Sequence, residues 1–592
     1  MDKSFDPSTP LRAGFAQDRP WLKYYEPGVR AHIDYPARAM HAFLEDVATQ
    51  SPDKTATIFG GVVQDALLDA KLSYKELNDL VNRLANALAA LGVKQGDRVA
   101  LYLPNCPQYI ISYYAALKLG AIVAPNNPMY VPRELTFQLN DSGSETIICL
   151  SRLYPYVRMV RPNTKLKNVI VTSIKEYYPP RLKAVFEQFV EEKDGHRVTI
   201  GADEHWFQDV LNRAPATPPN VQVKAEDTAV LLYTGGTTGV PKAAEITHKN
   251  VVANAFQCKE WVSNVPKEPP DATIVALPLY HSYAMTVCMN NAILQKMPMI
   301  LIPDPRNLEH LLKSVDRHQP TYFPGVPTMY MAFLNYPELS KYNVRCIKAC
   351  LSGAAPLPVQ VQIKFQELTG ARLIEGYGLS EATPVTHDNP LFGDNRIGTI
   401  GVPFPDTDSK IVDLETGEKE LPPGETGELI VKGPQVMKGY WNKPEETRLA
   451  LRNGWLYTGD IAVMDQDGYF RIVDRKKDMI IAGGYNIYPR DVEEVLYQHP
   501  QILEAAVAGI ADAYRGETVK AYVVLKSGQT ATAEDIITFC RDRLAAYKAP
   551  KIVEFRESLP KTMIGKILRR QLIAEDQAKA QAEQKTTDNA TA

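Results

Sequence analysis

One stretch rich in glycine and threonine, Tyr233-Thr-Gly-Gly-Thr-Thr-Gly-Val-Pro-Lys242, has the clearest potential for chemistry. Glycines let a backbone approach a charged ligand closely, and successive N–H groups can form a nest for an anion. Threonine hydroxyls and a lysine ammonium add donors for phosphate oxygens. The stretch therefore predicts a phosphate-binding loop, and the alternative is a hairpin turn that binds no ligand.

The surroundings of this loop do not fit a Walker A motif, which needs Gly-Lys-[Ser/Thr] at the start of a helix. An apolar run over 229–232 precedes the loop and predicts a buried strand. Residues 243–247 follow the lysine and predict a second strand. The loop is therefore expected between two strands.

Four further parts of the chain carry residues suited to the same chemistry. Taken singly, each has an ordinary interpretation: His281 as a core histidine, Tyr377 as a core aromatic, Asp460 as a turn residue and Lys566 as a surface lysine. The stretches are Leu277-Pro-Leu-Tyr-His281, Leu351-Ser-Gly-Ala-Ala-Pro356 with Glu375-Gly-Tyr-Gly-Leu-Ser-Glu381, Gly454-Trp-Leu-Tyr-Thr-Gly-Asp460 with Asp474-Arg475, and Leu559-Pro-Lys-Thr-Met-Ile-Gly-Lys566-Ile-Leu-Arg-Arg570.

In this order, the five stretches resemble the adenylate-forming superfamily of acyl-CoA synthetases, luciferases and peptide-synthetase adenylation domains. The resemblance covers residues 40–570 and is strongest to bacterial long-chain fatty-acid–CoA ligases, through the runs 324–328, 431–446 and 474–489. The chain departs from that group at 243–245, at Ala284, where glycine is common, and at 563–564. None of these departures removes a charged catalytic group.

The resemblance implies a nucleotide site. Thr234, Thr237, Thr238 and Lys242 would hold the β- and γ-phosphates, and Tyr377 would stack on adenine. Asp460 would accept hydrogen bonds from both ribose hydroxyls, supported by Arg475. Ser380 would reach the α-phosphate. The full set for ATP or AMP is Thr234, Gly235, Gly236, Thr237, Thr238, Gly239, Lys242, Gly353, Ala354, Ala355, Glu375, Gly376, Tyr377, Gly378, Ser380, Asp460 and Arg475.

The resemblance also implies catalytic roles. Lys566 would bridge the substrate carboxylate and the α-phosphate, His281 would lie between the acyl and nucleotide pockets, and Glu381 would bind Mg²⁺. Lys477 would be the hinge of a mobile domain. Gly483 and Gly484 would face coenzyme A. From their places beside the motifs, we expect the acyl pocket to include Tyr283, Ala284, Phe323, Val326 and Met329.

The implied reaction joins a fatty acid, expected to be long-chain, to CoA through an acyl-adenylate, using ATP and Mg²⁺ and releasing pyrophosphate and AMP. A ligase for medium-chain or aryl acids on the same scaffold is the alternative, followed by a silent acyl- or nucleotide-binding protein. Retention of Glu381, Asp460 and Lys566 argues against the silent protein. A peptide-synthetase module is disfavoured because no carrier domain follows Arg570.

Composition is ordinary for a soluble globular protein. The chain has 592 residues with 45% hydrophobic and 23% charged residues, and its net charge of −3 argues against nucleic-acid binding. Seven cysteines fit reduced thiols in the cytoplasm. No apolar run reaches the roughly 18 residues of a membrane span. Peripheral contact with the inner face of the membrane and a homodimer both stay open.

Ser73 and Glu76 form a capping box, which predicts a helix that begins at Ser73. A strand is expected at 321–323.

The fold class expected is a multi-domain α/β protein with a parallel sheet and covering helices, because strands and helices alternate through much of the chain. We expect an N-terminal arm (1–35) over the first domain, α/β subdomains with the acyl and ATP sites (36–404), and a β-rich subdomain (405–476). A mobile α+β domain (477–575) and a disordered tail (576–592) complete the chain. The pattern Asp465-Gln-Asp-Gly468 predicts a hairpin turn.

Overall fold

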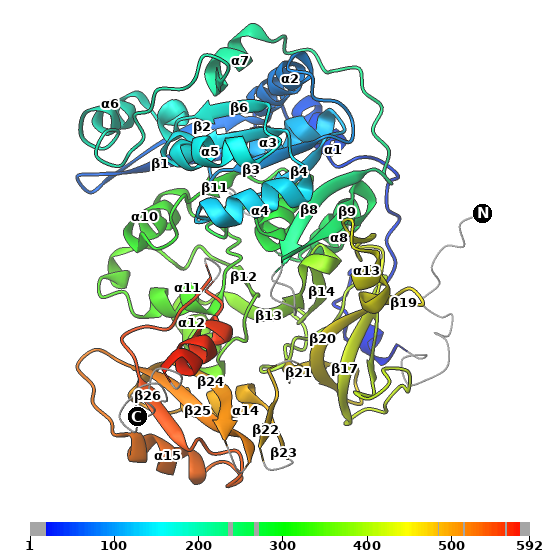
Figure 1. The fold of residues 1–592 in the computed structure, drawn as a ribbon, viewed down its shortest axis with the longest axis vertical. Coiled ribbons are helices and arrows are strands. Elements are labelled where there is room, and N and C mark those ends of the chain that lie inside the picture. Colours follow the sequence, from blue (N-terminus) through cyan, green and yellow to red (C-terminus); the bar gives the residue numbers. More distant parts are fainter. Residues whose placement is uncertain are drawn as a thin grey trace, which may run out of the picture.

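The computed structural model describes residues 19–234, 241–265, 271–476, 478–482, 485–512, 515–562 and 565–579. Residues up to about 400 build a large α/β region (Figure 1). Two smaller units follow it, a β-rich unit and a C-terminal unit of strands and helices. The multi-domain α/β class predicted from the sequence is thus confirmed.

The largest described sheet is mixed, with the order β18-β9-β8-β4-β3-β5-β6-β7. Pairing is parallel from β8 to β7, as the sequence predicted, and antiparallel where β9 and β18 join. All five residues of β5 are buried, as expected of a strand covered on both faces. The strands are β18 (Gly439–Tyr440), β9 (Lys242–Thr247), β8 (Thr228–Thr234), β4 (Ile122–Pro125), β3 (Arg98–Tyr102), β5 (Thr146–Leu150), β6 (Asn168–Thr172) and β7 (His205–Trp206).

Helices cover the sheets of this region. The helix predicted from Ser73 is α2, where the Ser73 side chain accepts from the Glu76 N–H and the Glu76 carboxylate accepts from the Ser73 N–H. Leu77, Val81, Leu84 and Leu88 on its apolar face are buried. The α-helices are α1 (His41–Gln50), α2 (Tyr74–Ala90), α3 (Pro107–Lys118), α4 (Pro132–Ser142), α5 (Tyr154–Val160), α6 (Pro180–Phe189), α7 (Phe207–Arg213), α8 (His248–Trp261), α9 (Asn291–Gln295), α10 (Leu308–His318), α11 (Pro327–Leu334) and α12 (Val359–Thr369).

Two four-stranded sheets complete the α/β region. Their orders are β10-β11-β1-β2 and β12-β13-β14-β15. The strand expected at 321–323 is wrong: Tyr322 makes only isolated bridges to Thr273 and Ala349, because the flanking Pro320 and Pro324 have no N–H for a ladder. The strands are β10 (Thr273–Val275), β11 (Met299–Leu301), β1 (Thr55–Val63), β2 (Ala66–Ser73), β12 (Ala349–Ser352), β13 (Arg372–Gly378), β14 (Val385–Asp388) and β15 (Val402–Pro403).

The β-rich unit is an antiparallel sheet of β16 (Asp408–Val412), β17 (Thr426–Lys432), β20 (Trp455–Met464), β19 (Leu451–Arg452) and β21 (Phe470–Arg475), with α13 (Pro444–Ala450) beside it. The turn predicted at 465–468 joins β20 to β21. Asp465 accepts there from the N–H groups of Asp467 and Tyr469, and Gly468 has a φ of 86°.

The described part of the N-terminal arm, 19–35, packs on both the α/β region and the β-rich unit. Arg30 pairs with Glu260 of α8 at 2.7 Å. Trp21 is 1% exposed and meets Phe470 edge-on, and Arg19 pairs with Asp408 at 2.8 Å. Burial of the large indole on the β-rich sheet gives this arm a fixed place.

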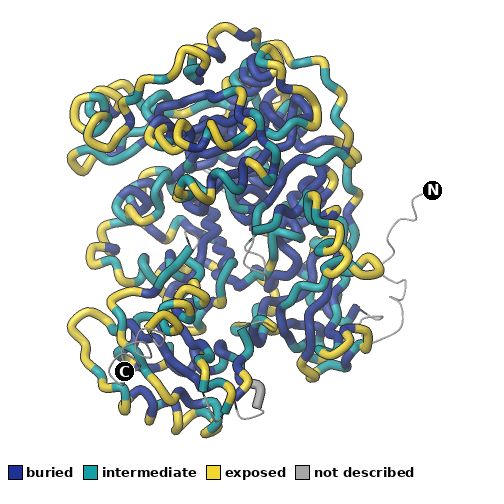
Figure 2. Tube along the Cα trace, in the orientation of Figure 1, coloured by how far each residue is buried: buried dark blue, intermediate teal, exposed yellow. Residues whose placement is uncertain are grey.

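The C-terminal unit has a sheet of β23 (Tyr485–Ile487), β22 (Ile480–Ala482), β25 (Gly516–Leu525), β24 (Ile502–Asp512) and β26 (Ile552–Phe555). Helices α14 (Pro489–Leu496) and α15 (Ala533–Arg541) pack on it, and its core is separate from that of the α/β region (Figure 2). The boundary predicted for the disordered tail, residue 576, lies too early in the chain. Residues 576–579 are helical, and the Asp576 carboxylate accepts a hydrogen bond from the Lys520 ammonium at 2.8 Å. We propose domain boundaries near 404 and 476 on this arrangement of sheets.

Candidate active site

A cavity of about 1150 Å³ lies where the α/β region, the β-rich unit and the C-terminal unit meet. Its wall includes Glu381 from the first, Asp460 from the second and Lys566 from the third. These three charged residues lie up to 185 positions apart in the sequence. The structure therefore brings the predicted motifs to one place.

The base of the glycine-threonine loop lies in the cavity wall. Strands β8 and β9 form the predicted pair of strands, and Thr234 is registered directly opposite Lys242. Both side chains therefore lie on one face of the sheet. Gly235, Gly236, Thr237, Thr238 and Gly239 fall outside the described residues.

Glu381 follows strand β13 and faces this base. Its Oε1 accepts hydrogen bonds from Thr234 Oγ1 at 3.3 Å and from the Tyr440 hydroxyl at 2.9 Å. The Lys242 ammonium lies over the Tyr440 ring, 5.2 Å from its centroid. Tyr440 thus connects the carboxylate and the lysine of the phosphate end.

Tyr440 is a site residue that sequence reasoning missed. It belongs to β18, which pairs with β9 through Tyr440 and Ala244, and this pairing joins segments nearly 200 residues apart. The tyrosine stood within the run 431–446 that carries the family resemblance, but nothing in that run indicates contact with Glu381. Only the pairing of β18 with β9 reveals its position.

The site fits one hard cation. Among the described residues, no group of three or more histidine, cysteine, aspartate or glutamate side chains forms a metal cluster. Mg²⁺ commonly binds through one or two carboxylates together with substrate phosphates. The described contacts of the Glu381 carboxylate both use Oε1, which leaves Oε2 for a cation at the phosphate end.

Asp460 forms the ribose end of the cavity and is 5% exposed. Its Oδ2 accepts from the Tyr377 hydroxyl at 2.5 Å, and its Oδ1 pairs with Arg475 Nε at 3.2 Å. The register of β20 and β21 sets Asp460 opposite Arg475. A carboxylate can accept about four hydrogen bonds, so capacity for two ribose hydroxyls remains.

Glycines form the floor between these two ends. Gly353, Ala354, Gly376, Gly378 and Ser380 line the cavity. A side chain at Gly378 would meet the Pro384 carbonyl oxygen at 2.2 Å, so only glycine permits this approach.

Among the described residues of the predicted nucleotide set, two lie outside the cavity wall. They are Ala355 and Glu375. The buried Glu375 carboxyl instead faces Arg490 of α14, with 3.6 Å between Oε1 and Nη2. The described ion-pair partner of Glu375 therefore belongs to the C-terminal unit, and its role in nucleotide binding stays a prediction.

His281 lies in the wall beside Lys566. The buried Asn105 fixes the loop that carries it: Asn105 Nδ2 donates to the carbonyls of Val275 and Leu277, and Asn105 Oδ1 accepts from Leu279 N–H. Burial, with a smaller effect of the Lys566 charge, lowers the pKa of His281 to about 4. The imidazole is therefore neutral at pH 7.

Lys566 is held by a tight turn. Lys566 N–H donates to Thr562 Oγ1 at 3.1 Å, and Thr562 N–H donates to the Lys566 carbonyl at 2.8 Å. Gly565 has a φ of 73°, and a Cβ there would lie 2.4 Å from Thr328 Oγ1 of α11. The turn therefore docks closely on the α/β region.

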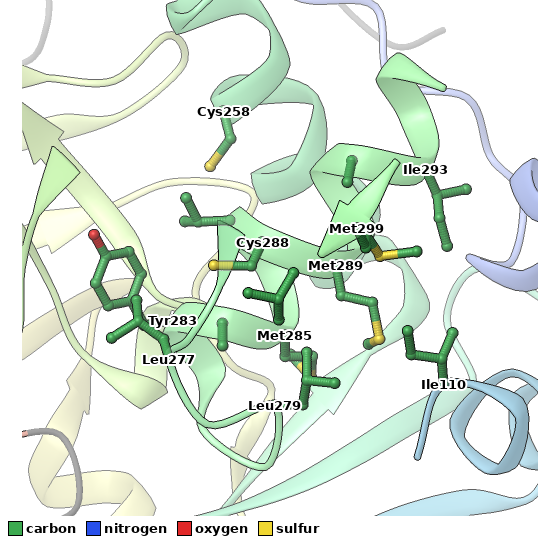
Figure 3. Packing of buried hydrophobic residues seen from close by; sticks show 14 of the residues in the cluster. Ile110, Cys258, Leu277, Leu279, Tyr283, Met285, Cys288, Met289, Ile293 and Met299 are labelled. Atoms are coloured by element: carbon green, nitrogen blue, oxygen red, sulfur yellow. The ribbon is translucent and has the colours of Figure 1, made fainter. Parts of the chain in front are cut away.

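The predicted acyl-pocket residues lie in the interior next to the cavity. Tyr283 lines the cavity and donates from its hydroxyl to the Leu351 carbonyl at 2.7 Å. Behind it, Met285, Cys288 and Met289 of a π-helix (Ala284–Asn290) fill the core (Figure 3). Ala284, Phe323, Val326 and Met329 are buried and lie outside the cavity wall, so their assignment to the pocket stays a prediction.

The two CoA-side glycines and the hinge residue stay predictions as well. Gly483, Gly484 and Lys477 lie outside the described residues. The neighbouring Lys476 lines the cavity and pairs with Glu428 at 3.2 Å.

Family comparison agrees with this geometry. The model of the AMP-binding enzyme family matches residues 44–441, and that of the AMP-binding enzyme C-terminal domain matches 491–566. The chain belongs to the AMP-binding enzyme family. These adenylate-forming enzymes include ligases that use ATP, Mg²⁺ and CoA.

Relatives of this AMP-binding enzyme include a long-chain-fatty-acid–CoA ligase of Bacillus subtilis, 47% identical over 94% of this chain and 98% of the relative. A ligase of the same name from Salmonella typhimurium is 40% identical over 95% of this chain and 99% of the relative. The solved structure of the anthranilate CoA ligase AuaEII with anthranoyl-AMP has a TM-score of 0.79 at 28% identity, covering 91% of this chain and 97% of that one. The resemblance predicted from the five motifs is confirmed.

Proposed function

We propose that this protein joins a long-chain fatty acid to coenzyme A through an acyl-adenylate. The observation that carries the proposal is the meeting of Glu381, Asp460 and Lys566 around one cavity. Two relatives that match nearly their full length are named as ligases of long-chain fatty acids. The overall reaction uses ATP and releases AMP and pyrophosphate.

The first step requires neutralised charge, because a carboxylate and a triphosphate repel each other. Lys242 would hold the outer phosphates, and Lys566 would bridge the acid and the α-phosphate. Fixed positive groups aimed at developing charge stabilise a transition state strongly. A magnesium ion on Glu381 and the phosphates, when bound, supplies further neutralisation of charge.

The nucleotide would be oriented by the opposite end of the cavity. Asp460 would accept from the ribose hydroxyls while Tyr377 and Arg475 hold its carboxylate in place. Adenine would rest against Tyr377 and the backbone at Gly353. Such positioning aligns the α-phosphate with the acid carboxylate, which lowers the entropic part of the barrier.

The second step needs the CoA thiol, instead of Lys566, beside the carbonyl group of the acyl-adenylate. The thiol of CoA attacks the acyl-adenylate, the thioester bond forms, and AMP leaves with the electron pair of the broken C–O bond. The observed arrangement, with Lys566 in the cavity, suits the first step. We infer that the C-terminal unit turns about Lys477 and brings Gly483 and Gly484 to the CoA path for the second.

The alternative substrate class is an aryl or medium-chain acid. It is supported by the fold shared with AuaEII, whose structure holds anthranoyl-AMP. The identity to this structure is lower, 28% against 47% for the Bacillus ligase, which favours the fatty acid. The catalytic groups alone do not distinguish the two classes, because both need the same adenylation chemistry.

The proposed localisation is the cytoplasm, where ATP and CoA are available. All seven cysteines are free thiols, and six are buried. No helix among the described residues is long and apolar enough to cross a membrane. Contact with the inner membrane face and a homodimer are further proposals, tested by vesicle flotation and by light scattering.

The function is tested with a panel of carboxylic acids, ATP, Mg²⁺ and CoA, by measuring AMP and the thioester. We expect the highest kcat/KM with long-chain saturated or unsaturated acids. A higher value with benzoate-type acids would favour the alternative. Absence of AMP and pyrophosphate with every acid would indicate the silent binding protein.

A further inference from the structure

One carboxyl group in the cavity wall has no role in the proposed reaction. Asp388 ends strand β14, is 1% exposed and lines the cavity. Its Oδ1 accepts from the Asn389 N–H at 3.1 Å. Its Oδ2 has no hydrogen-bond partner among the described residues. A buried polar atom without a partner is costly and calls for an explanation.

The strand register places Asp388 beside Tyr283. Gly376 pairs with Asp388, and a Cβ on Gly376 would lie 2.7 Å from Asp388 Oδ1. The parallel pair Ser352–Glu375 brings Gly353 next to Gly376 one residue further along. A Cβ on Gly353 would meet the Tyr283 ring at 3.2 Å. The Tyr283 ring and the Asp388 carboxyl therefore occupy one face of the sheet, in the space that the two glycines leave.

The ribose partner lies on the other face. Tyr377 and His387 are the next residues on the same two strands, so their side chains point the opposite way. Their rings lie 5.9 Å apart, and the Tyr377 hydroxyl reaches Asp460. Asp388 is thus separated from the ribose side and lies on the side of Tyr283, which belongs to the predicted acyl pocket.

The surroundings of this carboxyl favour its uncharged form. Burial, and to a smaller extent Glu375, raises the pKa of Asp388 well above its usual range. Burial likewise raises the pKa of the Tyr283 and Tyr322 phenols and of the Cys258 thiol around it. A protonated carboxyl can both donate and accept a hydrogen bond. It therefore matches a neutral hydroxyl group better than a bare alkyl chain.

We propose that Asp388 forms a polar subsite of the acyl pocket, which favours an acid carrying a hydroxyl group over the same acid without it. The inference rests on the proposed ligase function and names a substrate class within it. The substrate hydroxyl would donate to or accept from the carboxyl and satisfy Oδ2. An acyl chain without a hydroxyl group leaves Oδ2 without a hydrogen-bond partner, as in the free protein. Acids without the hydroxyl group therefore stay substrates.

The experiment compares matched acids in the full-length protein. The probes are hexadecanoic acid and its monohydroxy derivatives with the hydroxyl near the carboxyl, at mid-chain and at the methyl end, with cinnamic and 4-hydroxycinnamic acid as a rigid pair. We expect kcat/KM to be about 2- to 10-fold higher for at least one hydroxylated member than for its partner, the effect of one net hydrogen bond.

Two variants assign the preference to Asp388. Asp388→Asn keeps a hydrogen-bonding group and should keep the preference, whereas Asp388→Val should abolish it. The preference is measured within each variant, as the ratio of kcat/KM for the hydroxylated acid to that for its partner, so that a general loss of activity cancels. Equal ratios in wild type and Asp388→Val overturn the proposal, and so does a wild type that prefers no hydroxylated acid, whether or not a variant folds. If the wild type activates none of these acids, the ligase function itself fails.

Discussion

Gly565 is predicted to control the first half-reaction through its contact with the α/β region. Its φ of 73° and the 2.4 Å distance from an added Cβ to Thr328 Oγ1 make Gly565→Ala unfavourable in two ways. Thr328 Cγ2 would also lie at 3.3 Å. Because Thr328 belongs to α11 and Gly565 to the turn of Lys566, the second effect acts only when the turn is docked.

The two costs can be estimated separately. A left-handed φ costs a residue with a Cβ roughly 1–2 kcal/mol, whatever the position of the turn. Overpacking at Thr328 costs about 1–3 kcal/mol in the docked arrangement alone. The second effect corresponds to an about 5- to 150-fold loss of docked enzyme. We therefore expect pyrophosphate release from acid and ATP to fall by this factor or more.

The assay separates the half-reactions. Thioester formation from supplied acyl-AMP and CoA should fall much less, since it does not need Lys566 in the cavity. Thr328→Ala removes both Oγ1 and Cγ2, so the double variant should recover the part of the loss caused by overpacking. Thr328→Ala alone is the control and should adenylate normally. A double variant as slow as Gly565→Ala, or equal losses in both half-reactions, would refute the reasoning.

Three further predictions concern the cavity wall and the carboxyl behind it. Asp460→Ala should weaken apparent ATP affinity at least about 10-fold, because hydrogen bonds to a charged group contribute roughly 1.5–3 kcal/mol each; unchanged affinity in a titration would contradict the ribose role. Tyr440→Phe loses the bond to Glu381 and should raise the Mg²⁺ concentration for half-maximal pyrophosphate release about 10-fold, with KM for the acid unchanged as the control. Burial raises the pKa of Glu375 to about 7 despite Arg490, so the folded state binds the extra proton and loses stability as pH rises from about 4.5 to 7. Glu375→Gln should therefore gain stability relative to wild type across this range in thermal unfolding, and a pH-independent difference would refute it.

Local patterns allowed much of the fold to be predicted. The Ser73–Glu76 capping box gave the start of α2 within one residue, and the apolar run before the glycine-threonine loop gave β8. These signals depend on neighbours in the chain. The strand expected at 321–323 does not form, and Tyr322 makes only isolated bridges. The apolar run predicted a strand, but it does not show that the two flanking prolines limit the backbone hydrogen bonds to neighbouring strands.

The site was predictable where a motif carries its own chemistry and not where a contact joins distant segments. Glu381, Asp460 and Lys566 were identified from their motifs. Tyr440 was missed, because its contact with Glu381 depends on the pairing of β18 with β9. The contact of Glu375 with Arg490 was also missed, because Arg490 lies on α14, 115 residues later. The burial of a side chain and the identity of its contact partners depend on the folded chain, so a local motif does not predict them.

The central claim is that Lys566 acts in the cavity during adenylation and is not needed afterwards. It is tested most directly by measuring both half-reactions in Lys566→Ala. Lys561→Ala is the matched control, because this lysine lies in the same segment but pairs with Glu504 outside the cavity wall. We predict that Lys566→Ala loses pyrophosphate release from acid and ATP, yet converts supplied acyl-AMP and CoA to thioester at nearly the wild-type rate. Equal loss of both half-reactions in a folded Lys566→Ala protein would contradict the account.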